Sequence, residues 1–209
     1  MIILAIGAHF DDLELGCGGS LAKHVQQGDR VVALVITNSK YANHMGEVLR
    51  PRETALAEGR DAAAIIGYEE LICAEFTTLE LTFNNALVET INRVVDDYQV
   101  DMIYTHWDQD VHQDHQAVGR ATLAAGRKVN RMLMYRSNLY LTPHQFFANY
   151  YRDISNFIEV KMQGILAHRT EVEKFGAGWL DFWRNEARNN GQRMGVPYAE
   201  AFQLVKYLD

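Results

Sequence analysis

The chain has 209 residues, of which 48% are apolar and 22% are charged, and its formal net charge at pH 7 is −7. This length and composition are typical of a globular protein, and we expect a single domain over residues 1–209. The negative charge provides no global basic surface, and no apolar run reaches the roughly 20 residues of a membrane-spanning helix, so we expect neither a nucleic-acid partner nor membrane insertion.

The first half of the chain alternates short apolar runs with segments of helical period. We predict strands over residues 1–6, 31–37 and 70–74, helices over 20–27 and 52–66, and a long polar loop over 38–51. Ser20 is predicted to cap the first helix and Gly28 to end it. The opening run MIILAIGAHFDD lacks the basic segment and the cleavage site of a signal peptide, so we expect a cytoplasmic protein.

The second half continues the same alternation. We predict helices over residues 84–98, 116–127, 161–175 and 179–190, strands over 101–105 and 132–136, and a polar loop over 106–115. Strands that alternate with helices favour a mostly parallel sheet with helices on both faces. In doubly wound sheets, ligands bind outside the carboxyl ends of the strands, where the chain reverses direction. If the first and fourth strands are neighbours there, the loops after them converge.

These two loops carry the most ionisable residues of the sequence. The first, within GAHFDDLELGCGGS, offers His9, Asp11 and Asp12, and the second, within THWDQDVHQDHQAVG, reaches His115. Imidazole and carboxylate together suit zinc and related divalent ions, and a catalytic zinc keeps three protein ligands and one open position. We therefore predict a metal site made of His9, Asp12 and His115 at the carboxyl ends of the first and fourth strands.

Further groups in the same loops lie beside the predicted ligands. Asp11 adjoins a ligand yet stays free to take a proton, and His112 and Asp114 supply a second histidine and a carboxylate able to orient it. The alternatives to a metal site are that these histidine and aspartate side chains are solvated, or that the adjacent aspartates cap a turn. A dinucleotide site does not fit, because the spacing G-C-G-G differs from G-x-G-x-x-G. We expect these glycines to form a tight turn and to allow close backbone approach where the loop enters the helix.

Four segments resemble the PIG-L/LmbE-like zinc-dependent N-deacetylases. AHFDDLELGCGG resembles the family motif A-H-P-D-D-x-E-x-G-x-G-G, and VHQDHQAV resembles its second motif, H-x-D-H-x-x-V. RPRETALAEGRDAAAIIG is similar to the R-x-x-E helix of the family, and YAEAF is similar to a recurring late motif. The resemblance implies a Rossmann-like α/β fold and removal of the acetyl group from an N-acetylglucosamine-type conjugate.

The resemblance also implies roles for the loop residues. It makes His9, Asp12 and His115 the zinc ligands, although iron(II) suits the same donors. It makes Asp11 the general base that accepts a proton from the attacking water. The implied partner is a small amino-sugar conjugate, and the resemblance allows a homo-oligomer.

The remaining implied roles concern the leaving group and the substrate. His112 would stabilise the oxyanion or protonate the leaving amine, with Asp114 holding it in orientation. Arg52 falls where the family has an arginine near the substrate. Phe10 replaces the usual proline of the first motif and would alter the pocket. Asp110 would either orient a ligand histidine or bind a sugar hydroxyl.

Two other functions use the same residue types. A metal-dependent phosphoesterase also needs Asp and His clusters on an α/β sheet, but two-metal sites want more ligands and a bridging carboxylate. The spare Asp108 and Asp110 keep this alternative open. An inactive sugar- or metal-binding homologue would need the ligands but not the base, so the presence of Asp11 counts against it.

Overall fold

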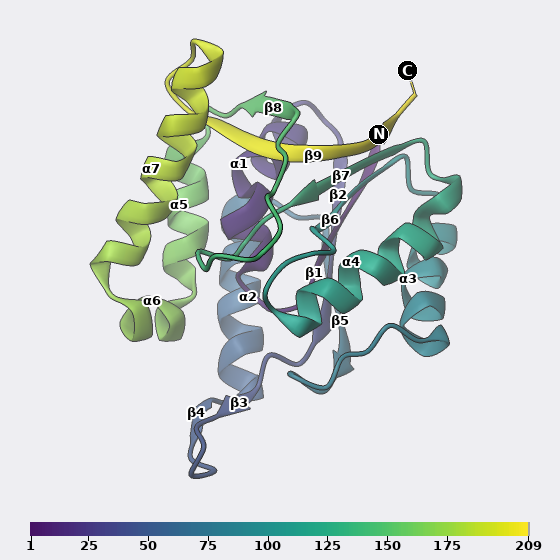
Figure 1. Cartoon of the computed structure of the whole chain (residues 1–209), viewed down its shortest axis with the longest axis vertical. Coiled ribbons are helices and arrows are strands. Elements are labelled where there is room, and N and C mark those ends of the chain that lie inside the picture. Colours follow the sequence, from purple (N-terminus) through teal and green to yellow (C-terminus); the bar gives the residue numbers. More distant parts are fainter. Residues whose placement is uncertain (209) are drawn as a thin grey trace.

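The computed structural model describes residues 1–208, which form a seven-stranded sheet with helices packed on both faces (Figure 1). The strands are β1 (Ile2–Gly7), β2 (Arg30–Thr37), β5 (Glu70–Phe76), β6 (Met102–His106), β7 (Arg131–Tyr135), β8 (Tyr150–Asp153) and β9 (Ala199–Tyr207). Their order across the sheet is β5-β2-β1-β6-β7-β9-β8. The first five are parallel, and β1 pairs with both β2 and β6, so the predicted neighbourhood of the first and fourth strands is confirmed.

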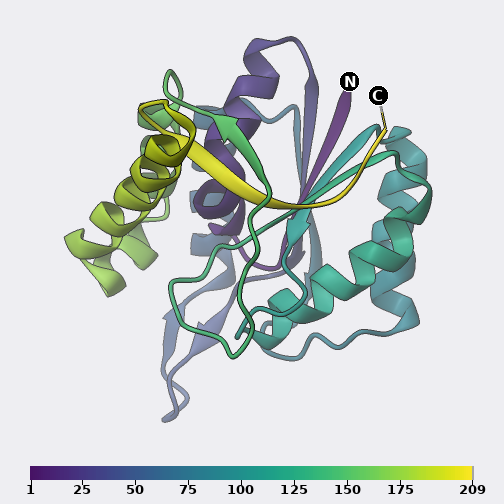
Figure 2. The same ribbon diagram turned by 45° about the horizontal axis from the view of Figure 1, so that its top comes forward.

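The helices form two layers, one on each side of the sheet. They are α1 (Asp12–Gln26), α2 (Arg52–Ile66), α3 (Asn85–Tyr98), α4 (Gln113–Ala125), α5 (Ile158–Ala167), α6 (Arg169–Phe175) and α7 (Ala177–Met194), with a short 3₁₀ helix η1 (Gly126–Lys128) after α4. Successive side chains of β1 point to opposite faces of the sheet: Ile3 packs in a core with α1, α5 and α7, whereas Leu4 packs with α3 and α4. Figure 2 shows both layers around the twisted sheet. The predicted doubly covered α/β fold is therefore confirmed.

Two antiparallel strands at one edge were not predicted. β9 pairs antiparallel with β7, and β8 pairs antiparallel with β9. β8 is short and only half-buried, and β9 mixes apolar residues with Glu200 and Lys206, so neither has the continuous apolar run of a central strand. The predicted helix over 161–175 is also divided, because α5 ends at Ala167 and α6 begins at Arg169.

The start of α1 differs from the prediction. The helix begins at Asp12, eight residues before Ser20, which is fully buried in its interior and is not a cap. The glycine-rich segment is therefore helical and forms no turn. A Cβ atom on Gly16 would collide with the ring of Tyr135 in β7, so this glycine allows the helix to approach the sheet closely.

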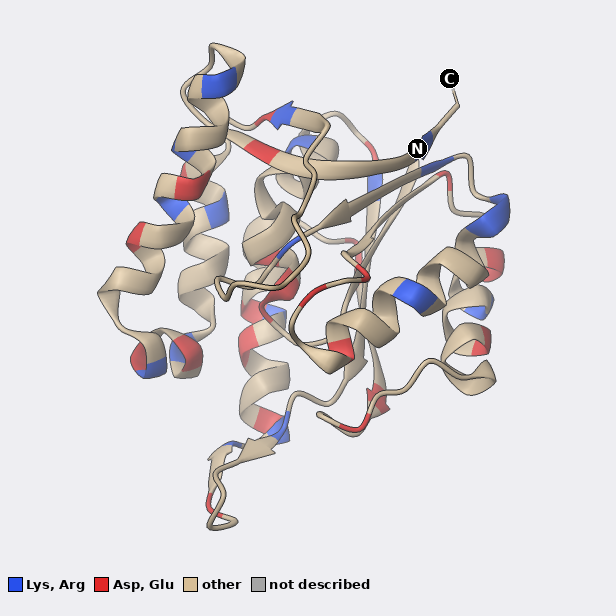
Figure 3. Ribbon diagram, in the orientation of Figure 1, with Lys and Arg blue, Asp and Glu red and all other residues tan. Residues whose placement is uncertain are grey.

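The predicted polar loop over 38–51 contains a small hairpin that projects from the body of the molecule (Figure 1). It consists of β3 (Tyr41–Ala42) and β4 (Val48–Arg50), with Tyr41 opposite Arg50. Lys and Arg residues are scattered over several helices and strands rather than gathered in one stripe (Figure 3). Among residues 1–208, no helix has the length and apolar character needed to cross a membrane.

Candidate metal centre and active site

The carboxyl ends of β1 and β6 bring two polar loops together. The two strands are paired in parallel, with Ala5 opposite Tyr104, so the chain leaves both at the same edge of the sheet. His9 lies in the loop after β1, and Asp12 is the first residue of α1. His115 lies in the first turn of α4, which follows β6. The pairing of two strands therefore places the three predicted ligands at one point.

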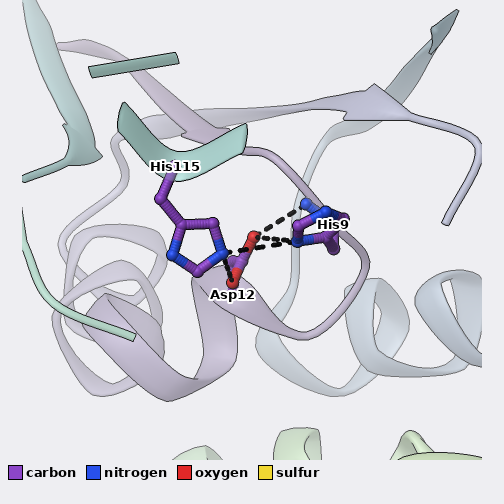
Figure 4. A group of neighbouring side chains, drawn as sticks. All are labelled: His9, Asp12 and His115. Atoms are coloured by element: carbon purple, nitrogen blue, oxygen red, sulfur yellow. Dashed lines mark hydrogen bonds and ion pairs between the residues drawn. The ribbon is translucent and has the colours of Figure 1, made fainter. Parts of the chain in front are cut away.

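The three side chains converge within hydrogen-bond distance of one another (Figure 4). His115 Nε2 lies 3.3 Å from both His9 Nδ1 and Asp12 Oδ1, and His9 Nδ1 lies 3.4 Å from Asp12 Oδ2. One ligand atom from each residue lies within 4.8 Å of the others. Two imidazole nitrogens and one carboxylate form a donor set that suits zinc or iron(II) and leaves a coordination position for another group.

The second ring nitrogen of each ligand histidine faces a buried carboxylate. His9 Nε2 lies 2.9 Å from Asp114 Oδ2, and His115 Nδ1 lies 3.5 Å from Asp110 Oδ1. Histidine ligands of metals usually carry such a partner, which fixes the orientation of the ring and makes it a stronger donor. This arrangement is an independent sign that the two rings are built to hold a cation.

Asp12 has further contacts besides those with the ligand side chains of His9 and His115. Its Oδ2 accepts the backbone N–H of His9 at 2.7 Å and lies 3.1 Å from His106 Nε2, and its Oδ1 accepts the hydroxyl of Ser137 at 2.8 Å. The prediction did not include His106 or Ser137 in the site. Both directly end or follow neighbouring parallel strands, so the same rule that located the ligands could have found them.

The pKa values show how strongly this group attracts positive charge. Burial lowers the pKa of His9, but hydrogen bonds to Asp114 and Asp12 outweigh it and raise the value to about 9. Burial also lowers the pKa of His115, but the charge of Asp12 and contact with Asp110 raise it to about 10. Without a metal, protons thus occupy the histidines, and a bound cation has to displace them.

Asp11 lies directly between two predicted site residues and faces a cavity of about 300 Å³. Its backbone has φ 127°, a conformation that non-glycine residues adopt rarely and that is common at functional sites. Burial and the neighbouring charge of Asp12 raise the pKa of its carboxyl to about 7. A carboxyl group that exchanges its proton near neutral pH is suited to general base catalysis.

His112 also faces this cavity and is fixed by its position at the start of α4. Its Nδ1 accepts the backbone N–H of Asp114 at 3.2 Å, and its ring stacks on that of His115 with centroids 4.6 Å apart. Burial and the charges of His115 and His9 lower its pKa to about 4, so the ring is neutral. The carboxylate of Asp114 bonds the ring of His9 at 2.9 Å, and it also lies within 4.8 Å of a ring nitrogen of His112.

The walls of the cavity come from segments far apart in the sequence. They are formed by Tyr41 and Arg50 of the hairpin, Leu79, the segment 137–140 after β7, and Glu171, Lys174, Phe175 and Trp179 of α6 and α7. Tyr41 and Tyr140, which are aromatic residues able to stack on a sugar ring, both line it. The cavity therefore combines the ionisable cluster with walls of apolar, aromatic and charged side chains.

The predicted substrate arginine lies elsewhere. Arg52 is exposed at the start of α2, where its Nε bonds Glu75 at 2.7 Å, and it does not line the cavity. Arg50, two residues earlier, is 2% exposed and lines the cavity, with its guanidinium bonded to Glu58 at 2.9 Å. Of these two arginines, it is thus Arg50 that lines the cavity.

Two other predicted substrate contacts are buried beside the cavity. Phe10 is 2% exposed, and its ring packs so closely on α2 that a Cβ on Gly59 would collide with it. Asp110 is also 2% exposed and accepts the backbone N–H of His112 at 2.8 Å while facing His115. Of the two roles left open for Asp110, the geometry favours orienting a ligand histidine.

Comparison with known proteins agrees with this arrangement. The family described as PIG-L: GlcNAc-PI de-N-acetylase matches residues 4–126, which include the whole ionisable cluster. The uncharacterized deacetylase YaiS of Escherichia coli is 38% identical over 65% of this chain and 73% of its own length. The diacetylchitobiose deacetylase of Thermococcus kodakarensis is 28% identical over 97% of this chain and 82% of its own.

A solved structure shows the same fold. The N,N'-diacetylchitobiose deacetylase of Pyrococcus horikoshii, in complex with an inhibitor, superimposes with a TM-score of 0.82 and 19% identity over 98% of this chain and 83% of that chain. The named relatives are deacetylases, that is, amide hydrolases, which confirms the predicted class of enzyme. The chain therefore belongs to the PIG-L family of N-deacetylases.

Proposed function

We propose that the protein is a zinc-dependent N-deacetylase that hydrolyses the acetamide of an N-acetylglucosamine-type sugar conjugate to acetate and an amine. The observation that carries this proposal is the convergence of His9, Asp12 and His115 beside Asp11 at one end of a cavity. Family membership supports the reaction, and the donor set supports zinc, with iron(II) as the other metal that it accepts. Relatives are named for N-acetylated sugars such as diacetylchitobiose.

The chain's own residues supply the proton transfers. When bound, zinc acts as a Lewis acid and lowers the pKa of water toward neutrality. Asp11 accepts the proton of the attacking water, since its carboxyl faces the cavity beside the ligands. The Nδ1 atom of neutral His112 accepts a backbone N–H, so the ring carries its proton on Nε2 and can donate a hydrogen bond to the developing oxyanion. Asp11 then passes the proton that it took from water to the leaving nitrogen, which departs as the amine. Asp114 and Asp110 keep the two ligand rings in place.

Part of the cavity wall lies outside residues 4–126, the region that matches the family. The matched residues 4–126 contribute the ligands and Asp11, whereas the segment 137–140 and the α6 and α7 residues contribute much of the wall. Both parts are needed to enclose one cavity, and we therefore propose one catalytic domain over the whole chain. The aromatic wall would accept the apolar face of a sugar ring.

Acetate release from a panel of N-acetylglucosamine conjugates tests this function. The zinc-loaded protein should release acetate from at least one conjugate, and Asp11→Asn should abolish that release while it keeps the metal. No acetate from any conjugate, with metal bound, would contradict the proposal and favour the sugar- or metal-binding alternative. Phosphate release from a phosphoester panel, with two metals per chain, would favour the phosphoesterase alternative.

A further inference from the structure

A second cavity of about 570 Å³ lies next to the candidate active site. It is lined by residues of α7, of β9 and of the segment 141–148. In Figure 1, β9 begins close to the end of α7. The segment 137–140 lines the first cavity but not the second, and Leu15 of α1 borders both. None of the proposed metal ligands or proton-transfer residues lines the second cavity. It is therefore a separate space rather than an extension of the metal site.

The inner wall of this cavity is rigid and its charges are neutralised. Glu200 accepts the backbone N–H groups of Gly19 and Ser20 at 3.0 and 2.7 Å. Lys161 Nζ donates to Glu200 Oε1 at 2.6 Å and to the carbonyl of Leu15 at 2.7 Å. Both side chains are almost fully buried. This ion pair ties β9 and α5 to the middle of α1 and forms a preformed surface with no spare charge.

The outer rim of the cavity contains a charged group that has no oppositely charged partner. Arg136 is paired with Glu186 at 3.1 Å, so these two groups also neutralise each other. Arg193 is bonded to Asn190 Oδ1 at 3.1 Å, and no carboxylate within residues 1–208 lies within 4.0 Å of its guanidinium. Around it, the exposed side chains of Gln145 and Asn189 line the cavity. The rim thus presents one unneutralised guanidinium among three amide side chains.

We infer that this second cavity binds a sugar-like polyhydroxyl compound that carries one anionic group. The guanidinium of Arg193 would take the anion, because its planar set of donors matches phosphate and carboxylate oxygens. Amides that can both donate and accept suit hydroxyl groups, and Gln145, Asn189 and Asn190 provide them. The inference does not depend on the proposed deacetylation, because it involves neither the metal group nor an acetamide.

Calorimetric titration of the full chain, with its metal, tests this inference. Glucose 6-phosphate is the probe, because it lacks an acetamide and carries the expected anion. We expect binding to the wild-type protein that is at least about 10-fold weaker in Arg193→Gln, as the loss of a charge-assisted hydrogen bond predicts. Arg184→Gln is the matched control, since this arginine lies on the same helix, pairs with Glu159 and does not line the cavity.

Several results would overturn the inference. These are no binding to the wild-type protein at millimolar concentration, equal binding to Arg193→Gln, or an equal loss in Arg184→Gln. If inorganic phosphate binds as tightly as glucose 6-phosphate, the amide side chains do not contribute to binding of the sugar. Binding of glucuronate that is also lost in Arg193→Gln would support the same site and identify carboxylate as an accepted anion. Circular dichroism checks that both exposed-arginine variants remain folded.

Discussion

Two clusters of histidine and aspartate lie at opposite ends of the sheet, and only one of them has the features of an active site. At the amino end, His24 Nδ1 lies 2.6 Å from Asp29 Oδ2, and its Nε2 lies 3.1 Å from the hydroxyl of Tyr104. Both nitrogens are thus bonded within the protein, and the ring lies away from both cavities. At the carboxyl end, His9 and His115 instead meet at a cavity. Proximity of histidine to aspartate does not by itself make a site.

The two clusters also differ in the sign of their pKa shifts. Burial and the charge of Arg152 lower the pKa of His24 to about 4, despite the contact with Asp29. His9 is partly buried, but two carboxylates raise its pKa to about 9. The two rings therefore shift in opposite directions, because His9 faces two carboxylates whereas His24 faces one carboxylate and the charge of Arg152.

The largest expected effect is the loss of a ligand. His115→Ala should lose the bound metal and reduce turnover by more than the ~10²–10⁴-fold typical of removing a proton-transfer residue. Elemental analysis and acetate release measure the two effects. His24→Gln is the control from the opposite cluster and should keep both metal and turnover. A His115→Ala protein with a full complement of metal would break the distinction between the two clusters.

The second-largest expected effect distinguishes catalysis from metal binding among the residues at the carboxyl ends of the strands. Asp11→Asn should keep the metal and lower kcat by about 10²–10⁴-fold, because the amide cannot accept the proton of water. Asparagine has nearly the same size and shape as aspartate, so the fold should be preserved. Parallel measurements of metal content and kcat check this prediction. Unchanged kcat would exclude Asp11 as the base.

The third effect concerns the carboxylates behind the ligand histidines. Asp114→Asn and Asp110→Asn should each weaken metal affinity by about 10–100-fold, because they orient His9 and His115. Competition with a metal-binding dye measures the affinity. Asp61→Asn, an exposed partner of Arg169, serves as control. If neither site variant differs from this control, the two carboxylates do not support the metal.

The smallest expected effect is a pH dependence of the free energy of unfolding, caused by His24 at the amino ends of the sheet strands. The pKa of His24 is about 4 in the folded chain against an ordinary value of 6.5, so the unfolded chain takes up the proton first as pH falls. The contribution of the neutral His24 ring to the free energy of unfolding is complete above pH 6.5 and is lost as the pH falls toward 4. Between pH 8 and 5.5 the loss is about 1 kcal/mol.

Urea unfolding of the wild type and His24→Gln over this pH range isolates that contribution. The difference between their free energies of unfolding should shrink by about 1 kcal/mol on acidification, because glutamine does not titrate. A difference that is constant from pH 8 to 5.5 would show that His24 titrates alike in both states.

The sequence alone predicted the features that depend on local patterns of apolar and polar residues. The apolar runs that became β1, β2, β6 and β7 predicted the parallel sheet, and the residues at their carboxyl ends predicted where the ionisable groups meet. The edge strands β8 and β9 were missed because their patterns are mixed. Ser20 was misread as a cap because glycines near it indicate a turn, whereas Gly16 lies against Tyr135 and Gly19 against Ile154, both more than 100 residues away along the chain.

Roles that depend on which way a side chain points were less predictable. Arg50 and Arg52 are two residues apart, but β4 ends at Arg50 and α2 begins at Arg52, so only the first returns toward the cavity. Asp114 lies next to His112 in the motif, yet the first turn of α4 directs its carboxylate to His9. The walls contributed by α6 and α7 carry no motif at all.

Titration of zinc into metal-free protein, with acetate release measured at each step, tests the central claim most directly. The account predicts no release without metal and a rate that rises until one zinc is bound per chain, since both possible three-ligand groups, His9 with Asp12 and His115 or His9 with His112 and Asp114, share His9. Full activity without metal would contradict it. So would a rate that needs a second zinc, or one bound zinc with no acetate released from any N-acetylglucosamine conjugate.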